Sequence, residues 1–359
     1  MSYTYSYTDI EREGVVFMFN RMSQLFLLLL VFFILGCSGG KSTPAAAPSP
    51  AQQSEIQTTP APQVAHYDEP AGPALHVDAG RAMQYTREIV AIGPRWDGGT
   101  GQQKVGAYLH GKLKNDQVEE DAFVADTPAG KIPMRNIVAK FPGTKDGIIV
   151  VGSHIDTNYP LRKTSFVGAN DGACTSALLL AIADELRGKK LEGYSVWLAF
   201  FDGEESITKE WTDDDSLYGS RHLASRWQQD GTNRKIKGFL LADMIGDADL
   251  DILRDEHSTS WLEDLVYEAA RRLGYQSYFF AGTGAMEDDH MPFKNLGVPV
   301  ADLIDFTYGY NNVYHHTTED TIDKLSTKSL KISGDVILET IRLLNANADK
   351  FGPTTKAAR

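Results

Sequence analysis

Two kinds of hydrophobic pattern alternate along the chain from about residue 75 to residue 350. Apolar residues at helical spacing predict five helices, over residues 78–93, 102–115, 172–188, 258–274 and 326–350. Short apolar runs rich in β-branched and aromatic residues predict six strands, over residues 118–126, 134–143, 147–156, 194–202, 236–246 and 298–306. Helices that alternate with strands apolar on both faces predict a three-layer α/β/α fold with a central mixed, mostly parallel sheet.

Residue types that bind metals follow the apolar runs, at the sheet edge where such folds collect their sites. They are His154, Asp156, Asp171 (after residues 166–169, counted as a strand end), Asp202, Glu204, Glu205, Asp243, His315 and His316. Each has a simpler interpretation alone: Asp171 as a helix cap, His154 as a hydrogen-bonded structural residue. Their shared position at five strand ends favours one site, and mixed histidine and carboxylate ligation suits Zn²⁺.

Two adjacent glutamates, Glu204 and Glu205, follow the apolar run over residues 194–202. Carboxylates near a core are costly unless they are paired, hydrogen-bonded or bound to a cation. Because neighbouring side chains of an extended chain point to opposite sides, we expect Glu205 to face a metal and Glu204 to face a substrate. Burial and the charge of Glu205 should raise the pKa of Glu204 toward the range useful for proton transfer.

The N-terminal segment has the features of a targeting signal. Arg21 precedes an apolar run over residues 25–35, about half of a membrane-spanning length, which ends at Gly36-Cys37. This resembles a bacterial lipoprotein signal, in which Cys37 carries the lipid; a short membrane anchor and an ordinary secretory signal are the alternatives. The first seventeen residues include acidic ones that are foreign to such a leader, so Met18 is an alternative start.

Composition then divides the chain into four parts. Seven of the 15 prolines fall between residues 38 and 73, in a composition that cannot bury a core. We expect a signal peptide over residues 1–37, a disordered tether over 38–75, a catalytic domain over 76–352 and a tail over 353–359. The expected location is the bacterial cell envelope, with the protein anchored to the membrane through Cys37 and facing the periplasm or the exterior. The net charge of −13 argues against a nucleic-acid partner.

Seven short motifs together resemble a known family. They are GSHIDT, FVGANDGA, FFDGEES, WTDDDSLYGSRHLA, LLADMIG, EDDHMPF and HHTTEDT. In this order they resemble the M28 zinc aminopeptidases, and more closely the zinc-dependent glutaminyl-peptide cyclotransferases, over about residues 77–344. The DSLYGSRHLA motif after a tryptophan and the DDHMPF motif are the parts more typical of the cyclotransferases.

The resemblance implies a role for each matched residue. It implies Asp171, Glu205 and His316 as ligands of one Zn²⁺, Glu204 as the general acid/base, Asp243 and Asp288 as acidic residues of the catalytic hydrogen-bond relay, and Trp211 as a wall of the substrate pocket. In the aminopeptidases His154 and Asp243 complete a second zinc site that Asp171 bridges, so the number of zinc ions, one or two, stays open.

The chain departs from the animal cyclotransferases at four positions. His315 stands where those enzymes have a tryptophan, and Glu287 stands where a glutamine is usual, so both enter the predicted pocket as residues that affect substrate selection. Ser153 and Ser176 occupy the positions of the animal disulfide.

The implied activity is conversion of the N-terminal glutamine of peptides or proteins to pyroglutamate with release of ammonia. An M28 aminopeptidase that hydrolyses N-terminal residues is the alternative. A third hypothesis, an inactive binding domain on the same fold, is disfavoured because no ligand or acid/base position is lost.

Overall fold

A six-stranded mixed sheet forms the centre of the protein, whose computed structural model describes residues 67–351. The sheet has the strand order β1-β2-β4-β3-β5-β8. Its strands are β1 (Gln117–Thr127), β2 (Gly130–Phe141), β3 (Ile148–His154), β4 (Ser195–Phe201), β5 (Ile236–Asp243) and β8 (Val300–Ile304). Strands β4, β3, β5 and β8 are parallel, whereas β2 runs antiparallel to both β1 and β4. A separate parallel pair consists of β6 (Ile252–Asp255) and β7 (Phe279–Gly284).

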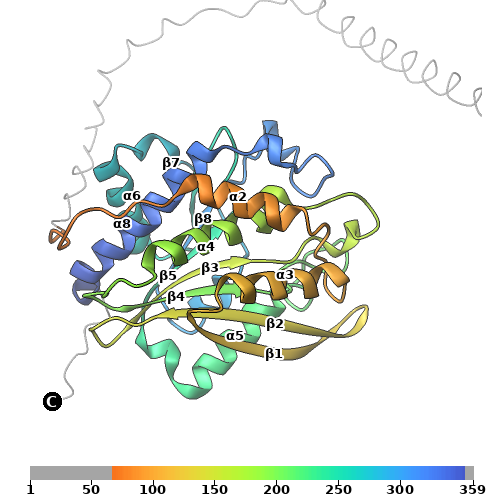
Figure 1. Ribbon diagram of the computed structural model, residues 1–359, viewed down its shortest axis with the longest axis horizontal. Coiled ribbons are helices and arrows are strands. Elements are labelled where there is room, and N and C mark those ends of the chain that lie inside the picture. The colour runs from red at the N-terminus through yellow and green to blue at the C-terminus, as the bar shows by residue number, and fades with distance from the viewer. Residues whose placement is uncertain (1–66, 352–359) are drawn as a thin grey trace, which may run out of the picture. The chain divides into compact units, whose positions relative to one another are not determined.

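Helices cover both faces of the central sheet. They are α2 (Ala79–Val90), α3 (Thr100–Lys112), α4 (Thr175–Leu186), α5 (Tyr218–Asp230), α6 (Ser260–Leu273), α7 (Met291–Lys294) and α8 (Thr327–Phe351). Figure 1 shows α2, α4 and α8 on one side of the sheet and α5 on the other. The predicted three-layer α/β/α architecture with a mixed, mostly parallel sheet is therefore confirmed.

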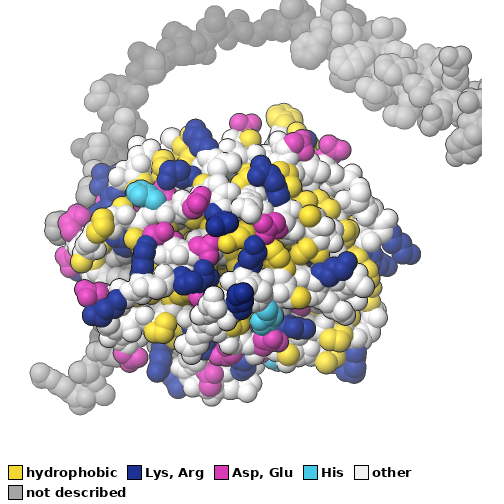
Figure 2. All heavy atoms as spheres, in the orientation of Figure 1, with side chains coloured by type: hydrophobic (Ala, Val, Ile, Leu, Met, Phe, Trp, Pro, Cys, Tyr) yellow, Lys and Arg dark blue, Asp and Glu magenta, His cyan; other side chains and the backbone are white. Residues whose placement is uncertain are grey.

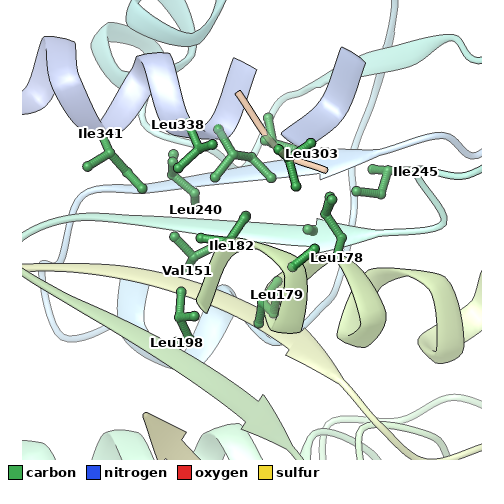
Figure 3. Packing of buried hydrophobic residues seen from close by; sticks show 14 of the residues in the cluster. Val151, Leu178, Leu179, Ile182, Leu198, Leu240, Ile245, Leu303, Leu338 and Ile341 are labelled. Atoms are coloured by element: carbon green, nitrogen blue, oxygen red, sulfur yellow. The ribbon is translucent and has the colours of Figure 1, made fainter. Parts of the chain in front are cut away.

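The two faces of the sheet bury two separate hydrophobic clusters. In β3, Ile149 and Val151 pack into the larger cluster with α4 and α8, whereas Ile148 and Val150 pack into the cluster that contains Trp227 of α5. Figure 3 shows the larger cluster, where strand residues meet leucine and isoleucine side chains of α4 and α8. Successive strand residues point to opposite faces, so the part of a strand that is buried on both sides must be apolar at consecutive positions, as residues Ile148 to Val151 are.

The predicted helices and strands are all present, with boundaries that differ by a few residues. The Asp78 side chain caps α2, because it accepts a hydrogen bond from the Arg81 backbone N–H at 2.9 Å. Helices α5 and α7 and strands β6 and β7 were not predicted. The apolar residues of α5 that pack on the sheet, Leu223, Ala224 and Trp227, are too few among polar neighbours to form a strong pattern.

The beginning of the described chain lies along α8. The backbone N–H of Asp68 donates to Asn347 Oδ1 at 2.7 Å, and that of Val77 donates to Asp335 Oδ1 at 2.9 Å. These contacts begin before the domain boundary expected at residue 76. The expected signal over residues 1–37, with Cys37, and the tail over 353–359 lie outside the described residues.

Charged side chains of both signs are mixed on the surface. On the face that Figure 2 shows, lysine and arginine are interspersed with aspartate and glutamate. Between residues 67 and 351, no helix has the length and apolar character needed to cross a membrane.

Candidate active site

The candidate site lies at the carboxyl ends of the parallel strands, where the direction of the chain through the sheet reverses. From β3 the chain passes through α4 to β4 on one side, and then through α5 to β5 on the other side of β3. His154 is the last residue of β3 and Asp243 the last of β5, while Glu204 and Glu205 follow β4 directly. The reversal leaves an opening above the strand ends in which these side chains meet.

Three of the predicted ligands come together there. His316 Nε2 lies 3.0 Å from Glu205 Oε1 and 3.4 Å from Asp171 Oδ2. Glu205 Oε1 and Asp171 Oδ2 are buried and have no hydrogen-bond partner. Unpaired buried carboxylate oxygens are costly, so this set of one imidazole and two carboxylates fits a bound cation.

A second group adjoins the first. His154 Nε2 lies 3.1 Å from Asp171 Oδ1 and 3.3 Å from Asp243 Oδ1, and the three side chains have the proximity of metal ligands. Neither ring nitrogen of His154 has a hydrogen-bond partner, nor does Asp243 Oδ1. The aspartate at position 171 therefore offers one oxygen to each group.

Asp171 does not follow a strand, contrary to the sequence-based expectation. It lies in a single π-helical turn, Ala169–Cys174, that leads into α4, and its side chain caps no helix. Gly172 has φ of +85°, and a Cβ there would lie 2.9 Å from His154 Cε1. The turn therefore needs a glycine for two reasons, backbone conformation and contact with the neighbouring ligand.

Two residues that the sequence did not single out support this turn. The Arg95 side chain is fully buried and donates to the carbonyls of Ile155, Val167 and Gly168 at 2.9, 2.6 and 3.1 Å. Asp320 accepts from the backbone N–H of Asn170 and of Asp171, at 2.8 and 3.2 Å. Asp320 belongs to the HHTTEDT motif, so its place in that motif was a signal; Arg95 belongs to no motif.

The two glutamates are held by their backbone. Asp156 accepts from the N–H of Glu204 and of Glu205, each at 3.1 Å, through its two oxygens. Asp202 accepts from Gln102 Nε2 and from the Arg135 N–H, both at 2.8 Å, and so joins the end of β4 to α3 and β2. Asp156 thus sets the strand-end turn and also lies 3.5 Å from His154 Nδ1.

The surroundings of Glu204 raise the pKa of its carboxyl group. Burial is the main cause that raises its pKa, and the nearby carboxylates of Asp288 and Glu205 raise it further, although His154 acts in the opposite direction. The pKa of Asp288 is also raised, by burial and then by Asp243 and Asp289. The site therefore contains carboxyl groups that can hold a proton near neutral pH.

A cavity of about 390 Å³ opens onto these groups. Among its lining residues are Asp171, Glu204, Glu205, Asp243, Asp288 and His316, together with the three predicted pocket residues Trp211, Glu287 and His315. The ring of His315 stacks on that of His316 with 3.8 Å between centroids. The Phe306 ring contacts the His315 ring, with 5.0 Å between their centroids. All of the predicted catalytic, ligand and pocket residues except His154 thus line one cavity, and His154 contacts two of these residues, Asp171 and Asp243.

The Ser153 and Ser176 hydroxyls lie 3.4 Å apart in the core between β3 and α4. Ser176 Oγ also donates to the His154 carbonyl at 2.8 Å. Hydrogen bonds therefore join the two positions where the resemblance places a disulfide in the animal enzymes.

Asp215 organises the loop that carries Trp211, and this leads to a prediction about pH. It accepts hydrogen bonds from the N–H of Ile207, the hydroxyl and N–H of Thr208, and the Tyr218 hydroxyl. Burial would raise the pKa of Asp215, but these hydrogen bonds outweigh it and lower the pKa. A lowered pKa stabilises the folded loop above the ordinary aspartate pKa, and this stabilisation is lost as the pH falls through the folded value.

We therefore expect the loop to keep its folded conformation from pH 7 to about pH 4 and to become less ordered below that pH. The substitution Asp215→Asn should loosen it at every pH and raise KM. The measurement is Trp211 fluorescence, as the difference between the protein and its Trp211→Phe variant, against pH. Asp213→Asn, at an exposed position of the same loop, is the control; equal KM values for the two variants would contradict the role of Asp215.

Residues 136–341 match peptidase family M28, and the chain belongs to this family. Within it the similar proteins include glutaminyl cyclases. The chain is 33% identical to a glutaminyl-peptide cyclotransferase-like protein of Bos taurus, over 66% of this chain and 68% of the relative. The structure resembles a glutaminyl cyclase of an Acidobacteriales bacterium, with TM-score 0.75 and 49% identity over 78% of this chain and 99% of that one. It also resembles a Zn-dependent exopeptidase of Parabacteroides distasonis, with TM-score 0.67 and 26% identity over 75% and 99% of the two chains.

Proposed function

We propose that the protein is a zinc-dependent glutaminyl-peptide cyclotransferase, which converts an N-terminal glutamine to pyroglutamate and releases ammonia. One observation carries this proposal. Glu204 and Trp211 line the same cavity as the three residues Asp171, Glu205 and His316. The 49% identity to a glutaminyl cyclase across nearly the whole of that chain supports it.

Asp171, Glu205 and His316 would hold the zinc ion. Three protein ligands of the histidine and carboxylate type are the usual set of a catalytic zinc site, and two of these three side chains carry an unpaired buried oxygen. When bound, zinc supplies a Lewis acid for the oxygen of the substrate carboxamide.

Glu204 carries the proton in this reaction. The α-amine of the substrate attacks the carboxamide carbon of the same residue, so the reacting groups are already close. The Glu204 carboxylate accepts a proton from the amine as the new C–N bond forms, and donates it to the departing nitrogen, which leaves as ammonia. Asp243 and Asp288 share the cavity wall, and the proximity of Asp288 raises the pKa of Glu204, which favours retention of the proton between the two steps.

A second candidate is peptide hydrolysis by an aminopeptidase with two zinc ions. It is favoured by the group of His154, Asp171 and Asp243, whose proximity suits a second ion. Purified protein should be incubated with one peptide that begins with glutamine and another that begins with leucine, and both should be followed by mass spectrometry. Loss of ammonia from the first supports cyclisation; release of leucine from the second, without loss of ammonia, would overturn it.

Removal of one ligand should weaken zinc binding. We expect Glu205→Gln to raise the Kd for zinc by about 100-fold or more, because even residues that only support a ligand contribute 10- to 100-fold. Competition with a chelator measures the change. Glu192→Gln, whose side chain is 77% exposed, is the matched control and should bind zinc like the unaltered protein; the same Kd in both variants would remove Glu205 from the ligand set.

We also propose that Cys37 carries a lipid that anchors the protein to the bacterial cell envelope, with its domain in the periplasm or outside the cell. The support is the sequence before Cys37, an apolar run that follows Arg21 and ends in glycine. Cys37→Ala should release the protein from the membrane fraction, and an unchanged distribution between fractions would contradict the anchor.

A further inference from the structure

A second cluster of buried ionisable groups lies outside the lining of the active-site cavity. The His290 ring stands between two carboxyl groups, with Nε2 3.2 Å from Asp255 Oδ2 and Nδ1 3.7 Å from Asp302 Oδ2. The three residues are at most 1% exposed. A ring with a different carboxyl group at each nitrogen has the arrangement of a bridging imidazole.

Asp255 is the ionised member of this cluster. Its Oδ1 accepts from the N–H of Met286 and of His257, at 3.0 and 3.1 Å, and its Oδ2 accepts from Ser258 Oγ at 2.7 Å. Burial would raise the pKa of Asp255, but His290 and these donors lower it. A carboxylate with this many donors remains charged even when it is buried.

Asp302 differs from Asp255 in its hydrogen bonding and in the direction of its pKa shift. Neither of its carboxyl oxygens has a hydrogen-bond partner. Burial, followed by the charges of Asp288 and Asp255, raises its pKa, so its neutral form is favoured. A neutral carboxyl group places no second charge beside the ring: its Oδ2 lies 3.7 Å from Nδ1 of His290, while Nε2–H of the same ring faces the charged Asp255.

The cluster holds the chain segment that carries Asp288. Met286 and His290 lie at the two ends of this segment, and both contact the carboxylate of Asp255, one through each oxygen. The Met286 carbonyl is also held, by His257 Nδ1 at 2.8 Å. Asp288 lies between these two points of attachment, on the wall of the active-site cavity.

We infer that Asp255, His290 and Asp302 form a positioning unit, which holds Asp288 at the cavity wall from behind during proton transfer. This inference rests on the proposed cyclotransferase function. Ser258 strengthens the unit, because its hydroxyl donates to Asp255 and accepts from the N–H of Asp302 at 2.9 Å. The cluster is thus joined both through the His290 ring and through Ser258.

A double-mutant cycle tests this unit. We expect His290→Ala to lower kcat/KM by about tenfold or more, and His290→Gln, which keeps a donor and an acceptor, to stay within about threefold. In an Asp288→Asn background, His290→Ala should cost less than about twofold, because the residue through which it acts is already altered. If the loss of kcat/KM in the double variant equals the product of the losses in the two single variants, the inference is overturned. Full activity of His290→Ala would overturn it as well.

If His290→Ala does not fold, Ser258→Ala replaces it in the same cycle. This milder change should lower kcat/KM by about two- to fivefold in the unaltered background and have no further effect with Asp288→Asn. Equal losses in both backgrounds would again overturn the inference.

A nitrogen NMR measurement keeps the inference separate from the proposed function. Comparison of the protein with His290→Gln at neutral pH identifies the signals of His290, and we expect a neutral ring with its proton on Nε2. A charged ring, or a proton on Nδ1, would overturn the bridge. If the protein makes no pyroglutamate but shows the Nε2–H ring, the proposed function fails and the bridge between Asp255 and Asp302 stands.

Discussion

Replacement of Glu204 by glutamine should lower kcat by about 100- to 10,000-fold and leave the zinc content unchanged. General acid/base catalysis by a positioned carboxylate contributes this much, and an amide cannot accept the proton of the attacking amine. Glu204 lines the cavity beside Glu205, yet only Glu205 lies at hydrogen-bond distance from His316. This difference supports the two roles proposed for these adjacent positions, proton transfer for Glu204 and zinc binding for Glu205.

The measurement is the rate of ammonia release from a peptide that begins with glutamine, together with elemental analysis for zinc. Glu210→Gln, on the exposed part of the following loop, is the matched control and should retain full activity. An active Glu204→Gln variant would contradict the assignment. Loss of zinc from that variant would show instead that Glu204 is a ligand.

Replacement of Arg95 by methionine should lower the free energy of unfolding by about 3–5 kcal/mol, the range found when one partner of a buried charged contact is removed. The guanidinium group is fully buried and donates to four backbone carbonyls, which methionine leaves without this donor. Burial lowers the pKa of Arg95 to about 10, while the carboxylates of Asp171, Asp156 and Asp320 act against this. Arg95 thus remains charged at neutral pH and offsets part of their negative charge.

Urea denaturation measures this change. Arg81→Met, at a side chain that is 48% exposed, is the control and should change the free energy of unfolding by less than about 0.5 kcal/mol. Because Arg95 supports the turn that carries Asp171, we also expect weaker zinc binding in Arg95→Met. A variant as stable as the unaltered protein would show that other contacts hold the carbonyls.

The hydrophobic pattern predicted most of the fold, and physical reasons explain what it missed. Strand β3 begins with four consecutive apolar residues because both of its faces are buried, and this makes it visible in the sequence. Helix α5 buries only a narrow stripe around Trp227, and β6 has four residues, so neither has a pattern long enough to be recognised. Residues 166–169 were counted as a strand end, but Ala169 begins the π-helical turn, with its tight bend at Gly172, that leads into α4.

The sequence by itself determined the layered α/β architecture and the residues at the strand ends that meet in the cavity, whereas Trp211, Glu287 and Asp288 were implied by the resemblance to the cyclotransferases. It could do so because burial on both strand faces, and polar residues at strand ends, are local properties that spacing records. Only the tertiary structure decided how these residues are supported. Arg95, Asp320 and the cluster around His290 act through partners that lie far away along the chain, and their contacts depend on how the strands are ordered in the sheet. No local pattern encodes such contacts, because they form only when the layers pack together.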